Sequence, residues 1–117
     1  MSERLIDLPT YESLKGMMGE DFIGELLGAY FEDSPRLIAQ LRQALADRDA
    51  ETFRTAAHSF KSTSASFGAL NLAAIARQLE LAGKEGALDG IGPRLEELCA
   101  EYGQVELALK ELRDAKG

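Results

Sequence analysis

A chain of 117 residues is long enough for a single domain with one modest hydrophobic core. Its 45% hydrophobic and 28% charged residues are typical of a folded globular protein, and a net charge of -7 disfavours nucleic acid and anionic membranes as partners. No apolar stretch approaches the roughly 20 residues that cross a bilayer, and the acidic start of the chain does not resemble a secretory signal. We therefore expect a cytoplasmic protein whose one cysteine, Cys99, is a small buried core residue in a reducing compartment.

The first part of the chain predicts two helices. A short helix follows Pro9 and runs to about Met18, with Thr10 in a position to cap its first turn. A long helix runs from about Glu20 to Ala46, with an apolar seam formed by Ile23, Leu26, Leu27, Tyr30, Leu37, Ile38, Leu41 and Leu45. Pro35 interrupts this run, but the seam keeps its phase across the proline, which favours one kinked helix over two separate elements.

The rest of the chain predicts three further helices. Asp49 is a good cap for a helix that runs to about Phe67, with Gly68 ending it. The next helix presents a packed face formed by Leu72, Ile75, Leu79 and Ala82. Four glycines make residues 83–92 the loosest part of the chain. The last helix has an unbroken apolar repeat formed by Leu88, Ile91, Leu95, Leu98, Tyr102, Val105, Leu109 and Leu112.

Together these elements predict an all-α fold. The expected architecture is an antiparallel four-helix bundle with a short additional N-terminal helix, in a single domain over residues 1–117. The seam of the last helix is also compatible with a coiled-coil dimer. Packing within its own bundle is favoured, because the other three long helices need a partner face, and we therefore expect a monomer.

The predicted helix over residues 49–67 has two different faces. At about 100° per residue, a core face is formed by Phe53, Ala57, Phe60, Ser64 and Phe67. His58, the one histidine in the chain, projects away from that face, and Lys61 lies one turn further along on the same outer half. We expect His58 to be exposed in mid-helix. Many exposed histidines and lysines only solvate their helix, so this placement alone does not establish a function.

The outer positions around His58 are unusually small. They include Ser59, Ser62, Ala65 and Ser66, whereas an exposed helix surface normally has long, strong helix formers such as Glu, Lys or Gln. Serine lowers helix propensity. What these residues provide instead is a flat, uncluttered surface that a partner can approach closely.

The run Ala57–Ala69, with the sequence AHSFKSTSASFGA, resembles the signature of histidine-containing phosphotransfer (HPt) domains. That signature is His-x-x-Lys-Gly, then several small residues, then a Leu-Gly-like helix end. His58, Lys61, the Ser/Ala block and Gly68 match it, and the apolar spacing down to Leu79–Glu80 is similar too. Ser62 stands where many members have glycine, but serine is also small.

The resemblance implies that the chain is an intermediate of a two-component phosphorelay. His58 is then the phospho-acceptor: its neutral imidazole attacks the phospho-aspartate of a receiver domain and passes the group to another receiver. Lys61 supplies positive charge for the phosphoryl oxygens. The implied partner-binding residues are Arg54, Ser59, Ser62, Ala65 and Gly68.

The resemblance also implies what the chain itself lacks. Response-regulator receiver domains and a hybrid sensor kinase are the implied partners, and the metal ion and transfer machinery belong to the receiver. We therefore expect a phosphocarrier rather than an enzyme, with no cofactor and no metal of its own. No phosphate-binding glycine motif follows a predicted strand, and one histidine cannot supply a di-metal bundle site.

Two other interpretations stay open from the sequence. One is a passive helical adaptor that binds a partner without being phosphorylated. The other is a phosphorylatable domain excised from a larger sensor kinase. Met1 and a complete bundle favour a free-standing protein over the excised domain.

Overall fold

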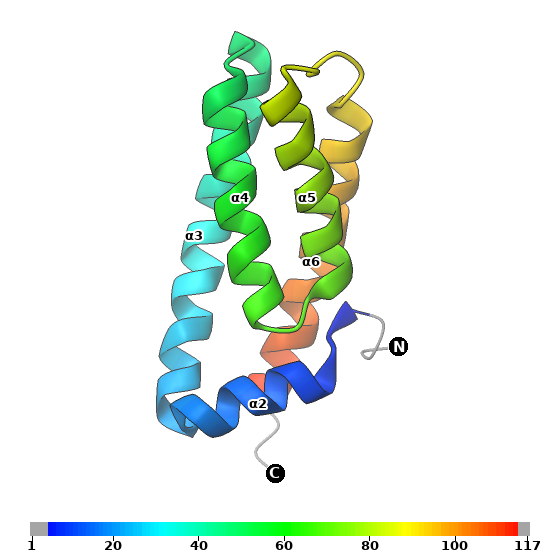
Figure 1. Cartoon of the computed structure of the whole chain (residues 1–117). Helices are drawn as coiled ribbons and strands as arrows, with labels where there is room; N and C mark the ends of the chain where they lie inside the picture. Colours follow the sequence, from blue (N-terminus) through cyan, green and yellow to red (C-terminus); the bar gives the residue numbers. More distant parts are fainter. Residues whose placement is uncertain (1–4, 115–117) are drawn as a thin grey trace.

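The computed structural model describes residues 5–114, which form five helices and no strand. The four long helices form an antiparallel bundle, and the short helix lies across its lower end (Figure 1). The short helix is α2 (Leu8–Met18), and the bundle helices are α3 (Glu20–Asp47), α4 (Ala50–Ser66), α5 (Leu70–Glu85) and α6 (Gly92–Asp114). The predicted all-α fold, with its additional N-terminal helix, is confirmed.

The start of α2 differs from the sequence prediction. The helix begins at Leu8, and its N-cap is Asp7, whose carboxylate accepts a hydrogen bond from the backbone N–H of Thr10 at 3.2 Å. Thr10 therefore lies inside the first turn rather than capping it. Pro9 fits this turn because its missing N–H is not needed there.

Two further sequence predictions concern the long helices. The run through Pro35 is one helix, as the phase of its apolar seam predicted. The connection between the last two helices is residues 86–91, which is shorter than the expected stretch of 83–92, because α5 continues to Glu85 and α6 begins at Gly92. Leu88 and Ile91 therefore precede the last helix instead of belonging to it, although Leu88 is buried in the loop.

The core contains the predicted apolar seams of all four bundle helices. The aromatic rings at its lower half pack against one another: Tyr30 lies 5.1 Å from Phe67, and both Tyr30 and Phe60 lie 5.8 Å from Tyr102, centroid to centroid. The seam of α6 is buried within this bundle at Leu95, Leu98, Tyr102, Val105 and Leu109. A coiled-coil dimer is therefore not needed to explain the apolar seam of α6.

Cys99 is less buried than predicted. It is only partly covered, and its Sγ accepts a hydrogen bond from Nη2 of Arg42 at 3.2 Å. The same guanidinium pairs with Glu96 one turn earlier on α6, so Arg42 ties α3 to α6 at the edge of the core.

Among the described residues, no helix is both long and apolar enough to cross a lipid bilayer.

Candidate functional site

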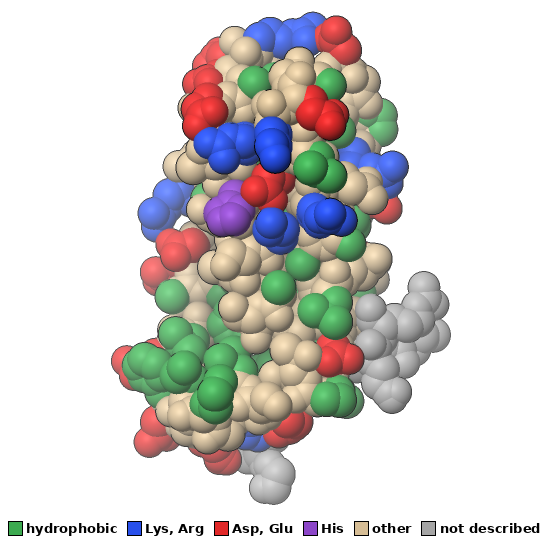
Figure 2. Space-filling model, viewed as in Figure 1, with side chains coloured by type: hydrophobic (Ala, Val, Ile, Leu, Met, Phe, Trp, Pro, Cys, Tyr) green, Lys and Arg blue, Asp and Glu red, His purple; other side chains and the backbone are tan. Residues whose placement is uncertain are grey.

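His58 lies in the middle of α4 and points out of the bundle. Its side chain is 59% exposed, which confirms the prediction from helical spacing. The opposite face of α4, together with the C-cap Phe67, is buried at all five predicted positions: Phe53, Ala57, Phe60, Ser64 and Phe67. Figure 2 shows the histidine on the surface that α4 and α5 form together, beside an acidic side chain and between basic ones. The amphipathic pattern of a single helix thus determines which way this imidazole faces.

Glu80 of α5 is the acidic neighbour of His58. Its Oε2 lies 2.8 Å from Nδ1 of His58, and its Oε1 lies 2.7 Å from Nζ of Lys61. One carboxylate therefore holds both of the residues that the sequence singled out. The side chain of Glu80 is only 18% exposed, so it is fixed between the two helices rather than free in solvent.

The charge state of Glu80 follows from these contacts. The hydrogen bond from Lys61 is the largest of the effects that hold the pKa of Glu80 below its usual range, and the contact with His58 acts in the same direction. Partial burial opposes this shift but does not reverse it. Glu80 is therefore ionised at neutral pH.

An ionised carboxylate can only accept hydrogen bonds, which determines the tautomer of His58. The proton of the neutral imidazole must lie on Nδ1, where it is donated to Glu80. The lone pair is then on Nε2. A histidine whose second nitrogen is oriented by a carboxylate is a common arrangement for nucleophiles and metal ligands, because it fixes both the ring and the reactive nitrogen.

The sequence pattern assigned no role to Glu80, although the signal was partly present. Leu79 belongs to the buried face of α5, so its neighbour Glu80 had to lie about 100° away from the core. What the sequence did not reveal is that α5 packs beside the outer side of α4 at the height of His58. That register is set by the packing of the two helices, the most extensively contacting pair in the described part of the chain.

Gly83 sets the distance between these two helices. A Cβ atom at this position would lie 2.9 Å from the Cα, the Cβ and the backbone nitrogen of Arg54, which is closer than packed atoms approach. Arg54 is one turn before His58 on α4, and Gly83 is one turn after Glu80 on α5. The backbones are therefore in contact one turn away from the hydrogen bond between His58 and Glu80.

The predicted partner-binding residues separate into two groups. Ser59 and Ser62 are exposed, and Ala65 and Arg54 are partly exposed, so these four lie on the surface around His58. Gly68 is buried, and its carbonyl accepts a hydrogen bond from the backbone N–H of Asp7 at 2.7 Å. A surface role for Gly68 does not fit this burial. Its φ of +86° and its contact with Asp7 make it a structural residue that ends α4.

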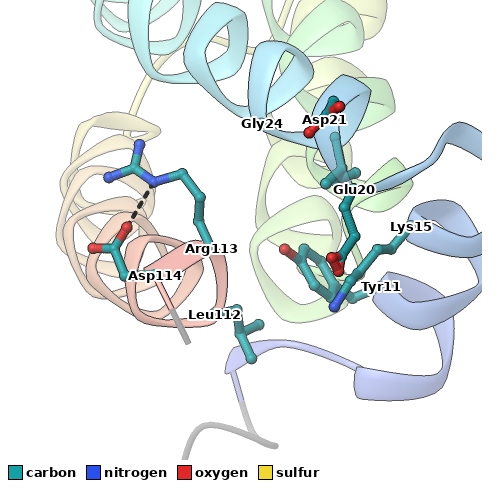
Figure 3. Close-up of a pocket in the computed structure, with 9 residues that line it drawn as sticks. Tyr11, Lys15, Glu20, Asp21, Gly24, Leu112, Arg113 and Asp114 are labelled. Atoms are coloured by element: carbon teal, nitrogen blue, oxygen red, sulfur yellow. Dashed lines mark hydrogen bonds and ion pairs between the residues drawn. The ribbon is translucent and has the colours of Figure 1, made fainter. Parts of the chain in front are cut away.

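A pocket of about 360 Å³ lies elsewhere, between α2, the start of α3 and the end of α6. Figure 3 shows Tyr11, Lys15, Glu20 and Arg113 around it. Acidic and basic side chains are mixed along its walls, and none of the residues predicted for the site lines it. Within residues 5–114 there is also no cluster of three or more side chains suited to hold a metal ion.

An exposed histidine beside a lysine, in the middle of a bundle helix, is the arrangement that the sequence resemblance to histidine-containing phosphotransfer domains led us to expect. Residues 25–115 match the Hpt domain family, and the chain belongs to this family. The structure is similar to the crystal structure of histidine-containing phosphotransfer protein B (HptB) from Pseudomonas aeruginosa PAO1. The TM-score is 0.89 and the sequence identity 31%, over 97% of each chain. No curated protein sequence matches the chain.

Membership of this family gives the chain a phosphotransfer role in a phosphorelay. Members of the family are phosphocarriers that interact with receiver domains and kinases. The interpretation of the chain as a passive adaptor is not favoured.

Proposed function

We propose that His58 carries the phosphoryl group, which it takes from the phospho-aspartate of one receiver domain and passes to the aspartate of another. The observation that supports this most directly is the hydrogen bond between Nδ1 of His58 and Glu80. It leaves Nε2 as the nucleophile on a side chain that is 59% exposed. A partner can therefore reach the reactive nitrogen without any movement of the bundle.

The transfer step balances without a separate base. The lone pair of Nε2 forms a bond to phosphorus while the bond from phosphorus to the aspartate oxygen breaks, and the electron pair of that bond leaves on the carboxylate. The imidazole then carries a phosphoryl group on Nε2 and keeps its proton on Nδ1, so the ring is cationic. The carboxylate of Glu80 lies 2.8 Å from Nδ1 and stabilises that positive charge.

The same contact supports the return step. A ring that stays protonated on Nδ1 is a better leaving group than a neutral phospho-imidazole, because the electron pair returns to Nε2 of a ring that becomes neutral. The group can therefore move on to a second receiver. Glu80 acts through the histidine and is a positioning residue in this proposal.

Lys61 has a different part in the proposal. In the structure its ammonium is held by Glu80 at 2.7 Å and is 30% exposed, close to the imidazole but paired. We propose that it turns toward the phosphoryl oxygens when they arrive, since their charge exceeds that of the carboxylate. The bond-making machinery and its metal ion belong to the receiver, so the chain is a carrier and not an enzyme. Burial of the α6 seam supports a monomer.

The test is phosphotransfer with the purified protein and a phosphorylated receiver domain. We expect the parent chain to gain an acid-labile phosphate and to lose it to a second receiver. His58→Gln should gain none, although its melting temperature should match the parent, because exposed substitutions usually change stability by less than about 0.5 kcal/mol. Phosphorus and nitrogen NMR should place the phosphate on Nε2. A parent chain that binds the receiver but acquires no phosphate would contradict the proposal.

A further inference from the structure

Basic side chains frame His58 along α4. Arg54 lies one turn before the histidine and Lys61 one turn after it, so both project from the same side of the helix. Both are already engaged, because Arg54 pairs with Glu51 and Lys61 pairs with Glu80. The positive charge on the α4 side of the site is therefore largely balanced by nearby carboxylates.

A second basic pair frames Glu80 along α5. Arg77 lies one turn before it and Lys84 one turn after it, and both are exposed. Because α4 and α5 are antiparallel, Arg77 is at the end of the site where Lys61 lies, and Lys84 is at the end where Arg54 lies. Figure 2 shows the result, with basic side chains above and below the histidine and its acidic neighbour.

The charge of this surface is opposite to that of the chain. Between them α4 and α5 contain four basic and three acidic side chains, a net charge of +1, in a chain whose net charge is -7. The remainder of the chain is therefore strongly acidic. A local basic surface on an acidic protein directs an anionic partner to one place and repels it elsewhere.

Arg77 and Lys84 differ from the α4 pair in having no partner of their own. Among residues 5–114, neither makes an ion pair or a side-chain hydrogen bond. Two exposed cations without partners, seven positions apart, span roughly 10 Å along the helix. The two cations therefore lie on either side of Glu80 and its partner His58.

We propose that Arg77 and Lys84 recognise the receiver domain by binding the acidic rim of its phosphorylation pocket. This rests on the proposed function. A pocket that holds a phospho-aspartate and Mg²⁺ is lined by carboxylates, because Mg²⁺ in proteins is bound by carboxylates together with phosphate oxygens. The ionised Glu80 repels such a pocket, and the two flanking cations offset that repulsion at the place where the partner must come closest.

The experiment compares two phosphoryl donors on one variant. Phosphoramidate is a small donor with no protein surface, whereas a phosphorylated receiver must dock. For Arg77→Gln/Lys84→Gln we expect the receiver rate to fall about tenfold more than the phosphoramidate rate at low ionic strength. The difference between the losses of rate with the two donors should shrink strongly when the salt is raised from about 20 mM to about 500 mM, since exposed charges are screened.

A matched control removes two cations from another surface. Arg94→Gln/Lys110→Gln makes the same change in net charge on α6, which lies behind α5 in Figure 1. We expect its receiver rate to stay within about twofold of the parent. If both double variants slowed transfer from the receiver equally, or if salt did not reduce the difference between the two donors, the proposed role of Arg77 and Lys84 would be refuted. A parent chain that takes no phosphate from either donor would instead refute the proposed function.

Discussion

Gly83 of α5 lies against the backbone of Arg54 in α4, where a Cβ atom would come within 2.9 Å of the Arg54 Cα. We therefore expect Gly83→Ala to force the two helices apart by a few tenths of an ångström. Overpacking of this kind costs about 1–3 kcal/mol, which outweighs the gain of up to about 1 kcal/mol in helix propensity. The contact between His58 and Glu80 should lengthen, because it lies one turn away.

Two measurements check this prediction: thermal unfolding and the ¹⁵N chemical shifts of the His58 ring, which report the fraction protonated on Nδ1. Gly103→Ala is the matched control, since Gly103 lies in α6 and a Cβ atom there would meet nothing within 4 Å. It should stabilise the protein by up to about 1 kcal/mol and leave the ring unchanged. A Gly83→Ala variant with parental stability and tautomer would show that this contact does not position the site.

The contacts of Glu80 predict that its contribution to stability depends on pH. Because its pKa is lowered in the folded protein, mainly by Lys61, its carboxylate stabilises the fold above the pKa of an unfolded glutamate, about 4.3. That stabilisation is lost as the pH falls below this value toward the folded pKa. Glu80→Gln cannot ionise, so it should be less stable than the parent at neutral pH and should approach the parent's stability in acid.

Urea unfolding of both proteins at about pH 7 and about pH 3 measures the effect, and taking the difference between them removes the contributions of other carboxylates. Asp49 and Glu96 also have lowered pKa values, so the parent alone would not isolate Glu80. A difference between parent and variant that did not change with pH would show that the carboxylate is not stabilised by its two partners.

Lys61 should affect the rate of phosphotransfer without being essential for it. The lysine contributes charge while the imidazole makes the bond, so Lys61→Ala should slow transfer from a receiver by about tenfold, or ~1.4 kcal/mol, without abolishing it. Lys61→Arg keeps the charge and should recover most of the rate. Single-turnover transfer at low salt is the measurement. Equal rates in the parent and Lys61→Ala would reduce Lys61 to a partner of Glu80 alone.

The small residues of α4 predict a steric effect. Ser62 is exposed one turn from His58, and Ser62→Glu adds both bulk and negative charge where a receiver would lie flat against the helix. Transfer from a receiver should fall much more than labelling by phosphoramidate. Gln104→Glu, at an exposed position of α6, adds the same charge on another surface and should change neither rate. Equal loss with both donors would mean that Ser62 affects the reactivity of the histidine itself.

Phe60 provides the opposite case, a core residue close to His58 in sequence but on the buried face of α4. Its ring is fully buried and packs edge-on against Tyr102 at 5.8 Å. Phe60→Ala should therefore cost roughly 3–5 kcal/mol of stability. Below the melting temperature of the variant, phosphoramidate should still label His58. A variant as stable as the parent would contradict the assignment of this face to the core.

Periodicity predicted the faces of single helices well, because the direction of a side chain follows from about 100° per residue. It placed His58 outside and Ser64 inside, where Ser64 is within 2.8 Å of the hydroxyl of Tyr30. It could not predict contacts between helices. The partnership of His58 with Glu80 and the close approach of Gly83 depend on how far α5 is displaced along α4, and no local pattern contains that displacement.

The helix ends show a second reason why the structure differs from the sequence prediction. Thr10 and Asp7 are both good capping residues, and the choice between them depends on where the preceding chain comes from. In the structure the backbone N–H of Asp7 is bound by the carbonyl of Gly68, which fixes the chain there. The same contact buries Gly68, which a motif match had placed on the partner surface. A tertiary contact therefore determines both which residue caps α2 and that Gly68 is buried.

The connectivity of the bundle has a consequence for folding kinetics. Among the described residues, each long helix packs against the next one in the chain, α3 on α4, α4 on α5 and α5 on α6, and these contacts outnumber those of α3 with α6 and of α2 with α4, which join distant segments. Such a topology has a low contact order, and helical domains of this kind fold in microseconds to milliseconds. His58 and Glu80 themselves come from consecutive helices joined by residues 67–69. The site is therefore completed by a local pairing, and a chain that has opened transiently regains its histidine–carboxylate contact without waiting for its two ends to meet.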